Sequence, residues 1–152
     1  MLTFSNDIKI KLLLLELNPY PALLRLLDHP DEFVVRRAIS SIYNLLLADT
    51  NSTPSNTQHP HFEVMQTLNG IQKIYKLFCN ERSNKFNKDR SALCLGRLFR
   101  LKELPSEMKT ITVDHLKSLL SDQDSQIREA SYQILQDIVQ NECNLKVWML
   151  SI

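Results

Sequence analysis

Hydrophobic side chains recur every three or four residues over three long stretches of the chain, with polar residues between them. In the second stretch, for example, Leu95, Leu98 and Phe99 fall on one side of a helix. This spacing is typical of amphipathic α-helices that bury one face and expose the other. It predicts long helices over residues 33–47, 88–101 and 125–139.

Shorter apolar segments precede the long ones and are separated from them by residues that end or start helices. Pro19 and Pro21 mark the end of one helix and the start of the next, since proline cannot continue a helix but suits its first turn. Asn69-Gly70 predicts a sharp corner. The pattern predicts shorter helices over residues 5–17, 22–27, 62–68, 71–78 and 113–120, and one more that begins at Pro105.

Two segments depart from the helical pattern. Residues 49–61 carry no apolar side chain other than two prolines, which predicts a flexible polar loop. Residues 144–152 form an apolar tail beyond the last long helix. This tail either packs back on that helix or stays exposed, with Trp148 and Met149 as contacts for a partner or for a second copy of the chain.

The composition favours helices over strands. Two glycines and six prolines among 152 residues are too few for the many tight turns of a β-sandwich or a nucleotide-binding α/β fold. The hydrophobic content of 43% is that of a folded chain. No apolar run has the length that crossing a bilayer needs, and the N-terminal residues do not form a secretory signal. We therefore expect one all-α domain over residues 1–152, without a membrane segment.

The chain also repeats itself. Leu26-Leu27-Asp28 followed by Val35-Arg36 corresponds to Leu119-Leu120 with an acidic turn, followed by Ile127-Arg128 about ninety positions later. Each copy reads as a short helix, an acidic turn and a long amphipathic helix. Such units cannot bury their apolar faces alone, so repetition predicts stacked repeats rather than a single globule.

These repeats resemble the armadillo repeat and the related HEAT repeat. The third helix of an armadillo unit carries small, x, x, small, Leu, x, Asn, Leu, and Gly70 resembles the glycine corner between the first two helices. The matching positions are Ala38, Ser41, Ile42, Asn44 and Leu45; Ser91, Cys94, Leu95, Arg97 and Leu98; and Ser131, Ile134, Leu135, Asp137 and Ile138. The resemblance implies a right-handed α-solenoid with a capping helix over residues 1–17, units over 19–48, 62–102 and 105–141, and an incomplete fourth unit over 144–152.

In armadillo proteins the third helices line a concave groove, where a row of asparagines grips an extended peptide. The corresponding row here is Asn44, Arg97 and Asp137, so only its first position is asparagine. The resemblance implies a non-catalytic scaffold that binds a partner protein or peptide. The mixed row predicts selection of a particular charged surface; the alternative is an ordinary solvated face.

Charge is unevenly distributed although the net charge is +1. Residues 71–102 contain nine basic and two acidic residues. Arg90, Arg97 and Arg100 share one side of a helix, and with Lys85 and Lys88 they predict a basic stripe. This stripe would bind an acidic or phosphorylated ligand, because the planar guanidinium group matches carboxylate and phosphate; the alternative is a charged helix surface. The acidic remainder of the chain and the lack of a recognised motif argue against nucleic acid.

No catalytic or metal-binding pattern is present. The sequence has no glycine-rich phosphate loop, no nucleophile elbow and no ligand spacing among its histidines and cysteines, so we expect no enzyme activity, cofactor or metal. His59 and His61 are expected on the surface of the polar loop. Thr53-Pro54 and Ser55 are candidates for phosphorylation there.

The three cysteines, Cys79, Cys94 and Cys143, are widely separated and lie in apolar helical segments. We expect them to be reduced and packed as small hydrophobic side chains, in an intracellular protein of the cytoplasm or nucleus. A further alternative is that the chain is a fragment of a longer repeat protein without an independent role, in which case it would associate with itself through its unfinished end.

Overall fold

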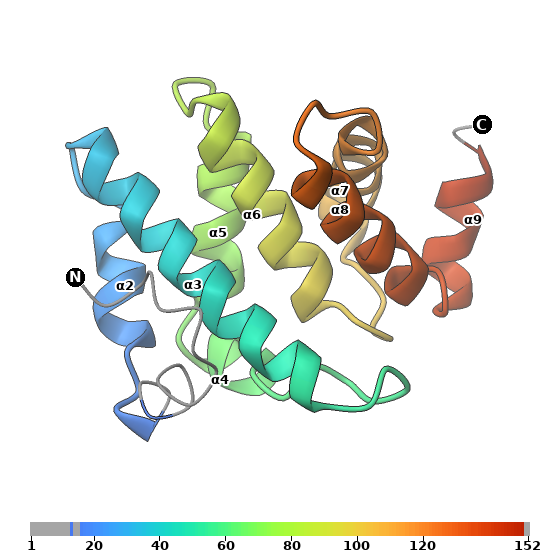
Figure 1. The fold of residues 1–152 in the computed structure, drawn as a ribbon, viewed down its shortest axis with the longest axis horizontal. Coiled ribbons are helices and arrows are strands. Elements are labelled where there is room, and N and C mark those ends of the chain that lie inside the picture. The colour runs from blue at the N-terminus through green and yellow to red at the C-terminus, as the bar shows by residue number, and fades with distance from the viewer. Residues whose placement is uncertain (1–12, 14–15, 151–152) are drawn as a thin grey trace.

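The computed structural model describes residue 13 and residues 16–150, and all regular elements in that part of the chain are α-helices (Figure 1). The prediction of an all-α fold is therefore confirmed for the described residues. The helices are α2 (Tyr20–Leu26), α3 (Glu32–Ser52), α4 (Phe62–Thr67), α5 (Gly70–Cys79), α6 (Lys85–Leu98), α7 (Ser106–Leu119), α8 (Ser125–Ile138) and α9 (Glu142–Leu150). The capping helix expected over residues 1–17 lies almost entirely outside the described residues.

The helices form two layers. In one layer α3, α6 and α8 lie side by side, and in the other α2, α5 and α7 lie behind them (Figure 1). Each rear helix packs against the long helix that follows it in the chain, so that α2 contacts α3, α5 contacts α6 and α7 contacts α8. The last helix, α9, packs against α7. The front layer thus presents three successive long helices on one face of the molecule.

The three long helices begin in the same way. Asp31 accepts a hydrogen bond from the backbone N–H of Phe33 at 2.8 Å, and Asp124 does the same for Gln126 at 2.8 Å. The side chain of Asn84 accepts from the N–H of Asn87 at 2.8 Å. A short oxygen-bearing side chain satisfies an N–H group that the helix leaves without a partner, which fixes the first turn. The acidic turns seen in the sequence are therefore helix caps.

The corner between α4 and α5 depends on Asn69 and Gly70 in different ways. Asn69 adopts the left-handed backbone conformation, with φ of 56°, which asparagine tolerates better than most residues. Gly70 does not have a positive φ, but a Cβ atom there would lie 2.8 Å from Met65 Cε and 3.0 Å from Leu24 Cδ1. The expected glycine corner is thus an asparagine turn, and the glycine is needed for packing space.

Helix α6 lies at the centre of the fold. It packs against α3, α5, α7 and α8, and every residue from Ser91 to Leu98 is buried. A Cβ atom at Gly96 would lie 2.3 Å from Ile134 Cγ2, so α6 and α8 approach each other closely at this position. The buried apolar side chains of all these helices form one continuous core.

Two expected boundaries were wrong. Residues 106–119 form one helix, α7, instead of two, because the segment contains neither glycine nor proline to break it. Helix α3 continues to Ser52, so the first part of the expected loop over residues 49–61 is helical. The tail forms α9 over Glu142–Leu150.

None of the helices within the described residues combines the length and the apolar character that spanning a membrane requires.

Candidate functional site

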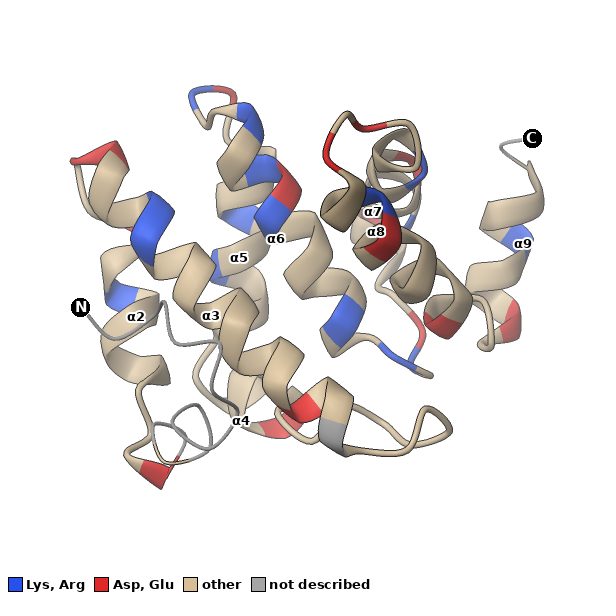
Figure 2. Ribbon diagram, in the orientation of Figure 1, with Lys and Arg blue, Asp and Glu red and all other residues tan. Residues whose placement is uncertain are grey.

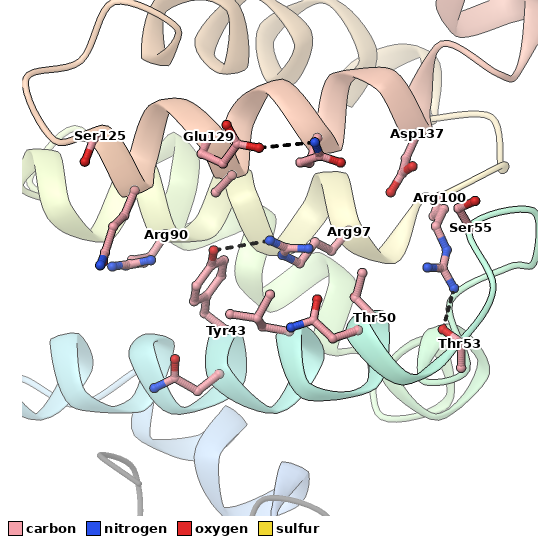
Figure 3. A pocket seen from close by; sticks show the side chains of 16 residues that line it. Tyr43, Thr50, Thr53, Ser55, Arg90, Arg97, Arg100, Ser125, Glu129 and Asp137 are labelled. Atoms are coloured by element: carbon pink, nitrogen blue, oxygen red, sulfur yellow. Dashed lines mark hydrogen bonds between the residues drawn. The ribbon is translucent and has the colours of Figure 1, made fainter. Parts of the chain in front are cut away.

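The five residues predicted to bind a partner line one groove. Helix α6 forms the floor of this groove, and α3 and α8 form its walls (Figure 3). The groove has a volume of about 790 Å³. The predicted residues that line it are Asn44 from α3, Arg90 and Arg97 from α6, Arg100 from the segment after α6, and Asp137 from α8. Charged positions of both signs lie along this face of the molecule (Figure 2).

Arg97 is almost completely buried in the floor of the groove. This residue is only 7% exposed, and its Nη2 atom donates a long hydrogen bond of 3.4 Å to the hydroxyl of Tyr43 (Figure 3). Its Nε atom is buried and has no hydrogen-bond partner among the described residues. A buried guanidinium that lacks full hydrogen bonding is costly, so the fold holds this side chain in the floor of the groove at an energetic cost.

Arg100 holds the polar loop and is not an exposed binding residue. It is 1% exposed and donates from Nη2 to the hydroxyl of Thr53 at 2.9 Å (Figure 3), with longer contacts of 3.5 Å to the hydroxyl of Thr57 and the carbonyl of Gln58. Burial lowers the pKa of Arg100 from its ordinary value, against the opposing charge of Asp137. The prediction that Arg100 belongs to a surface stripe was therefore wrong, because its main hydrogen-bond partners belong to its own chain.

Alternating guanidinium groups and aromatic rings run along the junction of α3 and α6. The Arg36 Cζ atom lies 4.2 Å from the centroid of the Phe86 ring, and Arg90 Cζ lies 5.4 Å from the same ring. Arg90 Cζ and Arg97 Cζ lie 4.5 Å and 5.3 Å from the Tyr43 ring. We call Arg36, Phe86, Arg90, Tyr43 and Arg97, in this order, the cation–π ladder. Stacking on a ring leaves the N–H groups at the edges of each guanidinium free to donate.

The ladder extends the groove beyond the predicted residues. A second hollow of about 450 Å³ shares Tyr43, Asn44 and Arg90 with the first, and Arg36 and Phe86 also line it. Sequence reasoning missed Arg36, Tyr43 and Phe86 as site residues. Their spacing was the available signal, since Phe86 and Arg90 are four residues apart and Arg36 and Tyr43 are seven apart, which places each pair on one helix face.

The opposite wall of the groove carries carboxylates. Asp137 is half-buried, and burial raises the pKa of its carboxyl group despite the nearby charges of Arg100 and Arg97. Glu129 accepts a hydrogen bond from Gln133 at 3.2 Å on the same helix (Figure 3). The groove therefore has a basic floor on α6 and an acidic side on α8, and the α3 wall is neutral within the groove.

The lysines of the basic segment do not belong to the groove. Lys85 pairs with Asp89 at 2.5 Å and with Asp122 at 2.6 Å, which raises its pKa. Lys73 pairs with Asp28 at 2.5 Å, and Lys102 lies 3.7 Å from a carboxylate oxygen of Glu63. The continuous stripe of Lys85, Lys88 and three arginines was therefore wrong, since the fold turns Lys85 towards acidic residues of its own chain and neither lysine lines the groove.

The polar loop is held in place by His59. This residue is 2% exposed, so the expected surface position was wrong. Its Nε2 atom lies 3.1 Å from the carbonyl of Leu46 and 3.1 Å from the hydroxyl of Thr50, and its Nδ1 atom accepts from the N–H of His61 at 3.2 Å. Burial lowers the pKa of His59 to about 4, and the charges of Arg100 and Arg97 act in the same direction. His59 is thus neutral and ties the loop to the end of α3.

Tyr20, His61 and Asp49 form a hydrogen-bonded row beside this loop. The Tyr20 hydroxyl lies 2.5 Å from His61 Nδ1, and His61 Nε2 lies 2.6 Å from a carboxylate oxygen of Asp49. The order of groups resembles a nucleophile with its base, but Tyr20 is 2% exposed and burial raises the pKa of its hydroxyl, the opposite of activation. This row therefore has a structural role, because it joins α2, the polar loop and α3.

The two predicted apolar contacts at the end of the chain differ in exposure. Trp148 is partly buried and packs against the core, and Lys117 from α7 donates to its carbonyl at 2.8 Å while lying 4.7 Å from its ring centroid. Met149 is 64% exposed. The tail therefore packs back through Trp148, and it leaves Met149 and Leu150 on the outside.

The cysteines are free, but only Cys94 is buried. Cys79 and Cys143 are exposed, so their expected packing was wrong. In the part of the chain that the structure describes, histidine, cysteine and carboxylate side chains form no group of three or more that would hold a metal ion.

Comparison of the chain with protein-family models, with curated proteins and with solved structures found no match.

Proposed function

We propose that this chain is a protein-interaction scaffold, built as an α-solenoid of armadillo- or HEAT-like units, that binds a partner protein or peptide in the groove formed by α3, α6 and α8. The observation that carries the proposal is the convergence of Asn44, Arg90, Arg97 and Asp137 on one groove. These residues come from three successive long helices, and a groove built in this way spans the stacked units.

The two-layer arrangement supports the solenoid interpretation. Each unit contributes one rear helix and one long front helix, and the front helices of neighbouring units pack side by side (Figure 1). The middle unit has an additional short helix, α4, before its corner, which is the armadillo-like feature, whereas α7 and α8 form a two-helix, HEAT-like unit. Stacking of such units shares apolar surface between neighbours and leaves the front face open.

A non-catalytic role fits the chemistry of the described residues. The arginines of the groove are stacked on rings or bonded to the loop, and the raised pKa of the half-buried Asp137 has burial as its main cause. Exposed free thiols at Cys79 and Cys143 fit a reducing compartment, so we place the protein inside the cell.

Selection of peptides from a random display library tests the proposal. Gln133 is exposed and lines the groove, and Gln133→Trp fills the groove without disturbing a buried group. Gln136→Trp is the matched control, because Gln136 is exposed on the same helix, lies outside the groove lining and also donates a hydrogen bond to the residue four positions earlier. We expect selected peptides to bind Gln133→Trp at least about tenfold more weakly than Gln136→Trp. Equal binding by the two variants contradicts a groove-binding role.

A second candidate contact is the outer face of α9. Leu145, Met149 and Leu150 are exposed there, with Leu150 at 86%. An apolar face of this kind favours association with a second copy of the chain. Sedimentation at increasing protein concentration tests this candidate: Met149→Glu should reduce any association, and a monomer at all concentrations contradicts it.

A further inference from the structure

We infer that the groove takes an acidic peptide segment whose carboxylate side chains pair with the guanidinium groups of the cation–π ladder. This inference rests on the proposed function, and it specifies the chemistry of the ligand. It depends on four observations about the ladder, which concern its missing counter-charges, the orientation of its donors, its length and the state of its aromatic rings.

The arginines of the ladder have no acidic partner within the described residues. Described carboxylate oxygens lie within 4.0 Å of Lys73, Lys85, Lys102 and Lys109, but none lies that close to Arg36, Arg90 or Arg97. The fold therefore pairs these lysines with carboxylates, whereas Arg36, Arg90 and Arg97 form no ion pair among the described residues, and only the more distant charge of Asp137 acts on Arg97. Unpaired charge at a concave surface attracts an opposite charge from outside the chain.

The ladder also orients its donors. The Arg90 guanidinium lies over both the Phe86 and the Tyr43 rings, and that of Arg97 lies over the Tyr43 ring. A guanidinium that is held by its face loses little conformational freedom when its edge pairs with a carboxylate. The Nε atom of Arg97 is buried without a partner among the described residues, so the hydrogen-bonding capacity of this guanidinium is only partly used within its own chain.

The length of the ladder selects several carboxylates over one phosphate group. Arg90 and Arg97 are seven residues apart on α6, which corresponds to about 10 Å along the helix axis. A single phosphate group is bound by donors that converge on one point, whereas these donors are distributed in a line. A peptide in the polyproline II conformation advances about 3.1 Å per residue with three residues per turn, so acidic side chains three residues apart lie on one side of it at close to this separation.

The aromatic rings argue against single-stranded nucleic acid. Proteins that bind such strands offer open aromatic faces on which bases stack. Here the Phe86 ring has Arg36 and Arg90 within 5.4 Å of its centroid, and the Tyr43 ring has Arg90 and Arg97 within the same distance. The carboxylates of Glu129 and Asp137 on the opposite wall also repel a continuous phosphate backbone, but they leave room for a peptide that carries its acidic side chains on one side only.

Fluorescence anisotropy with a labelled peptide of glutamate and glycine tests the inference on the full chain. The control probe has glutamine in place of every glutamate, and further probes are a phosphoserine–glycine peptide and an oligothymidylate. The test variants are Arg36→Gln and Arg90→Gln, both on partly or fully exposed positions of the ladder. The matched control is Arg25→Gln, which removes the same charge from an exposed position of α2 outside both hollows.

We expect the glutamate peptide to bind and the glutamine peptide not to bind. Each ladder variant should weaken binding about tenfold, and Arg25→Gln less than about twofold, because a hydrogen-bonded charge pair contributes more than the general charge of the surface. Raising the salt concentration should weaken binding of the glutamate peptide. Circular dichroism of each variant checks that the fold is retained.

Three results would overturn the inference. In the first, the display-selected peptides are neutral, and Gln133→Trp weakens their binding but Arg90→Gln does not. This result would refute the acidic ligand and keep the proposed function. In the second, the phosphoserine peptide or the oligothymidylate binds more tightly than the glutamate peptide, and Arg90→Gln weakens that binding. The ligand would then belong to another class than the carboxylates. Failure of every probe and of the display selection would reject the groove as a binding site altogether.

Discussion

The guanidinium carbon of Arg90 lies 4.5 Å from the centroid of the Tyr43 ring, and this contact joins α6 to α3 inside the groove. Tyr43 is only 6% exposed, and its hydroxyl also accepts the hydrogen bond from Arg97. One aromatic side chain therefore positions two of the arginines that we assign to ligand binding. Its removal should affect both the stability of the helix pair and the orientation of the donors.

Two substitutions at Tyr43 separate these effects. Tyr43→Phe keeps the ring and loses the 3.4 Å hydrogen bond to Arg97, so we expect the free energy of unfolding to fall by about 1 kcal/mol or less. Tyr43→Leu also removes the ring from Arg90 and should lower it by about 2 kcal/mol more. Urea unfolding followed by circular dichroism measures both values. Equal stability of the two variants would show that the ring contributes nothing beyond its apolar volume.

Acid should weaken the fold through His59. The folded state holds the pKa of His59 at about 4, below the ordinary value of 6.5, so the unfolded chain binds a proton more readily between these values. Stability from this group is complete above pH 6.5 and is lost as the pH falls towards 4, by about 3 kcal/mol in all.

His59→Gln tests this pH dependence, since glutamine does not titrate and retains a donor for the Leu46 carbonyl. Thermal unfolding between pH 7 and pH 4 should show a smaller loss for the variant than for the parent chain. Other groups, His61 among them, leave some slope in both proteins, because burial lowers the pKa of His61 as well. Identical slopes would exclude His59 as a source.

Gly96 should not tolerate a side chain. The Cβ atom of an alanine there would meet Ile134 Cγ2 at 2.3 Å, and Leu116 Cδ1 and Ile138 Cδ1 at 3.2 and 3.3 Å. Overpacking of this kind costs about 1–3 kcal/mol, and the better helix propensity of alanine offsets up to about 1 kcal/mol of it. We expect Gly96→Ala to lower the free energy of unfolding by about 1–2 kcal/mol in urea.

A double-mutant cycle identifies the cause. Ile134→Ala removes the Cγ2 atom and leaves space at Gly96. Gly96→Ala should therefore be less destabilising in the Ile134→Ala background than in the parent chain. Strict additivity of the two changes would mean that α6 and α8 are not in the close contact described above.

Asn144 should be required for the junction of α6, α7, α8 and α9. It is fully buried; its Oδ1 atom accepts from the Leu104 N–H at 3.0 Å, and its Nδ2 atom donates to the carbonyls of Lys102 and Ile138 at 2.8 and 3.3 Å. Asn144→Leu leaves these backbone groups buried without their partner, so we expect a loss of about 2–4 kcal/mol. Chemical denaturation measures this loss. Gln140→Leu is the control, because Gln140 is exposed; Asn141→Leu is unsuitable because Asn141 caps α9.

The helices were predictable because their signals are local. Capping residues such as Asp31 and Asp124, and the spacing of leucines, act within a few positions of the chain. The polar loop was misread for the opposite reason. Nothing near His59 in the sequence indicates that its ring is buried and hydrogen-bonded to the carbonyl of Leu46, thirteen positions earlier.

Part of the site was predictable because its signals are local, and the rest was not because it depends on contacts between distant parts of the chain. Arg90 and Arg97 followed from their positions on one helix face, and the structure places both in the groove. Their stacking partner Tyr43 lies about fifty positions earlier, so the ladder depends on the packing of α3 against α6. Arg100 has the same chemistry as its neighbours, and only the fold shows that Thr53 of the loop is its partner.

The reactivity of the Cys94 thiol can report how often the central helix, α6, separates transiently from its neighbours. The thiol is fully buried in α6 and burial raises its pKa to about 12, whereas the thiols of Cys79 and Cys143 are exposed. A thiol-specific reagent should therefore modify two sulfur atoms at once and the third only when α6 detaches from its neighbours. The rate of that slow third modification would measure, in the native protein and without denaturant, how often the floor of the groove opens.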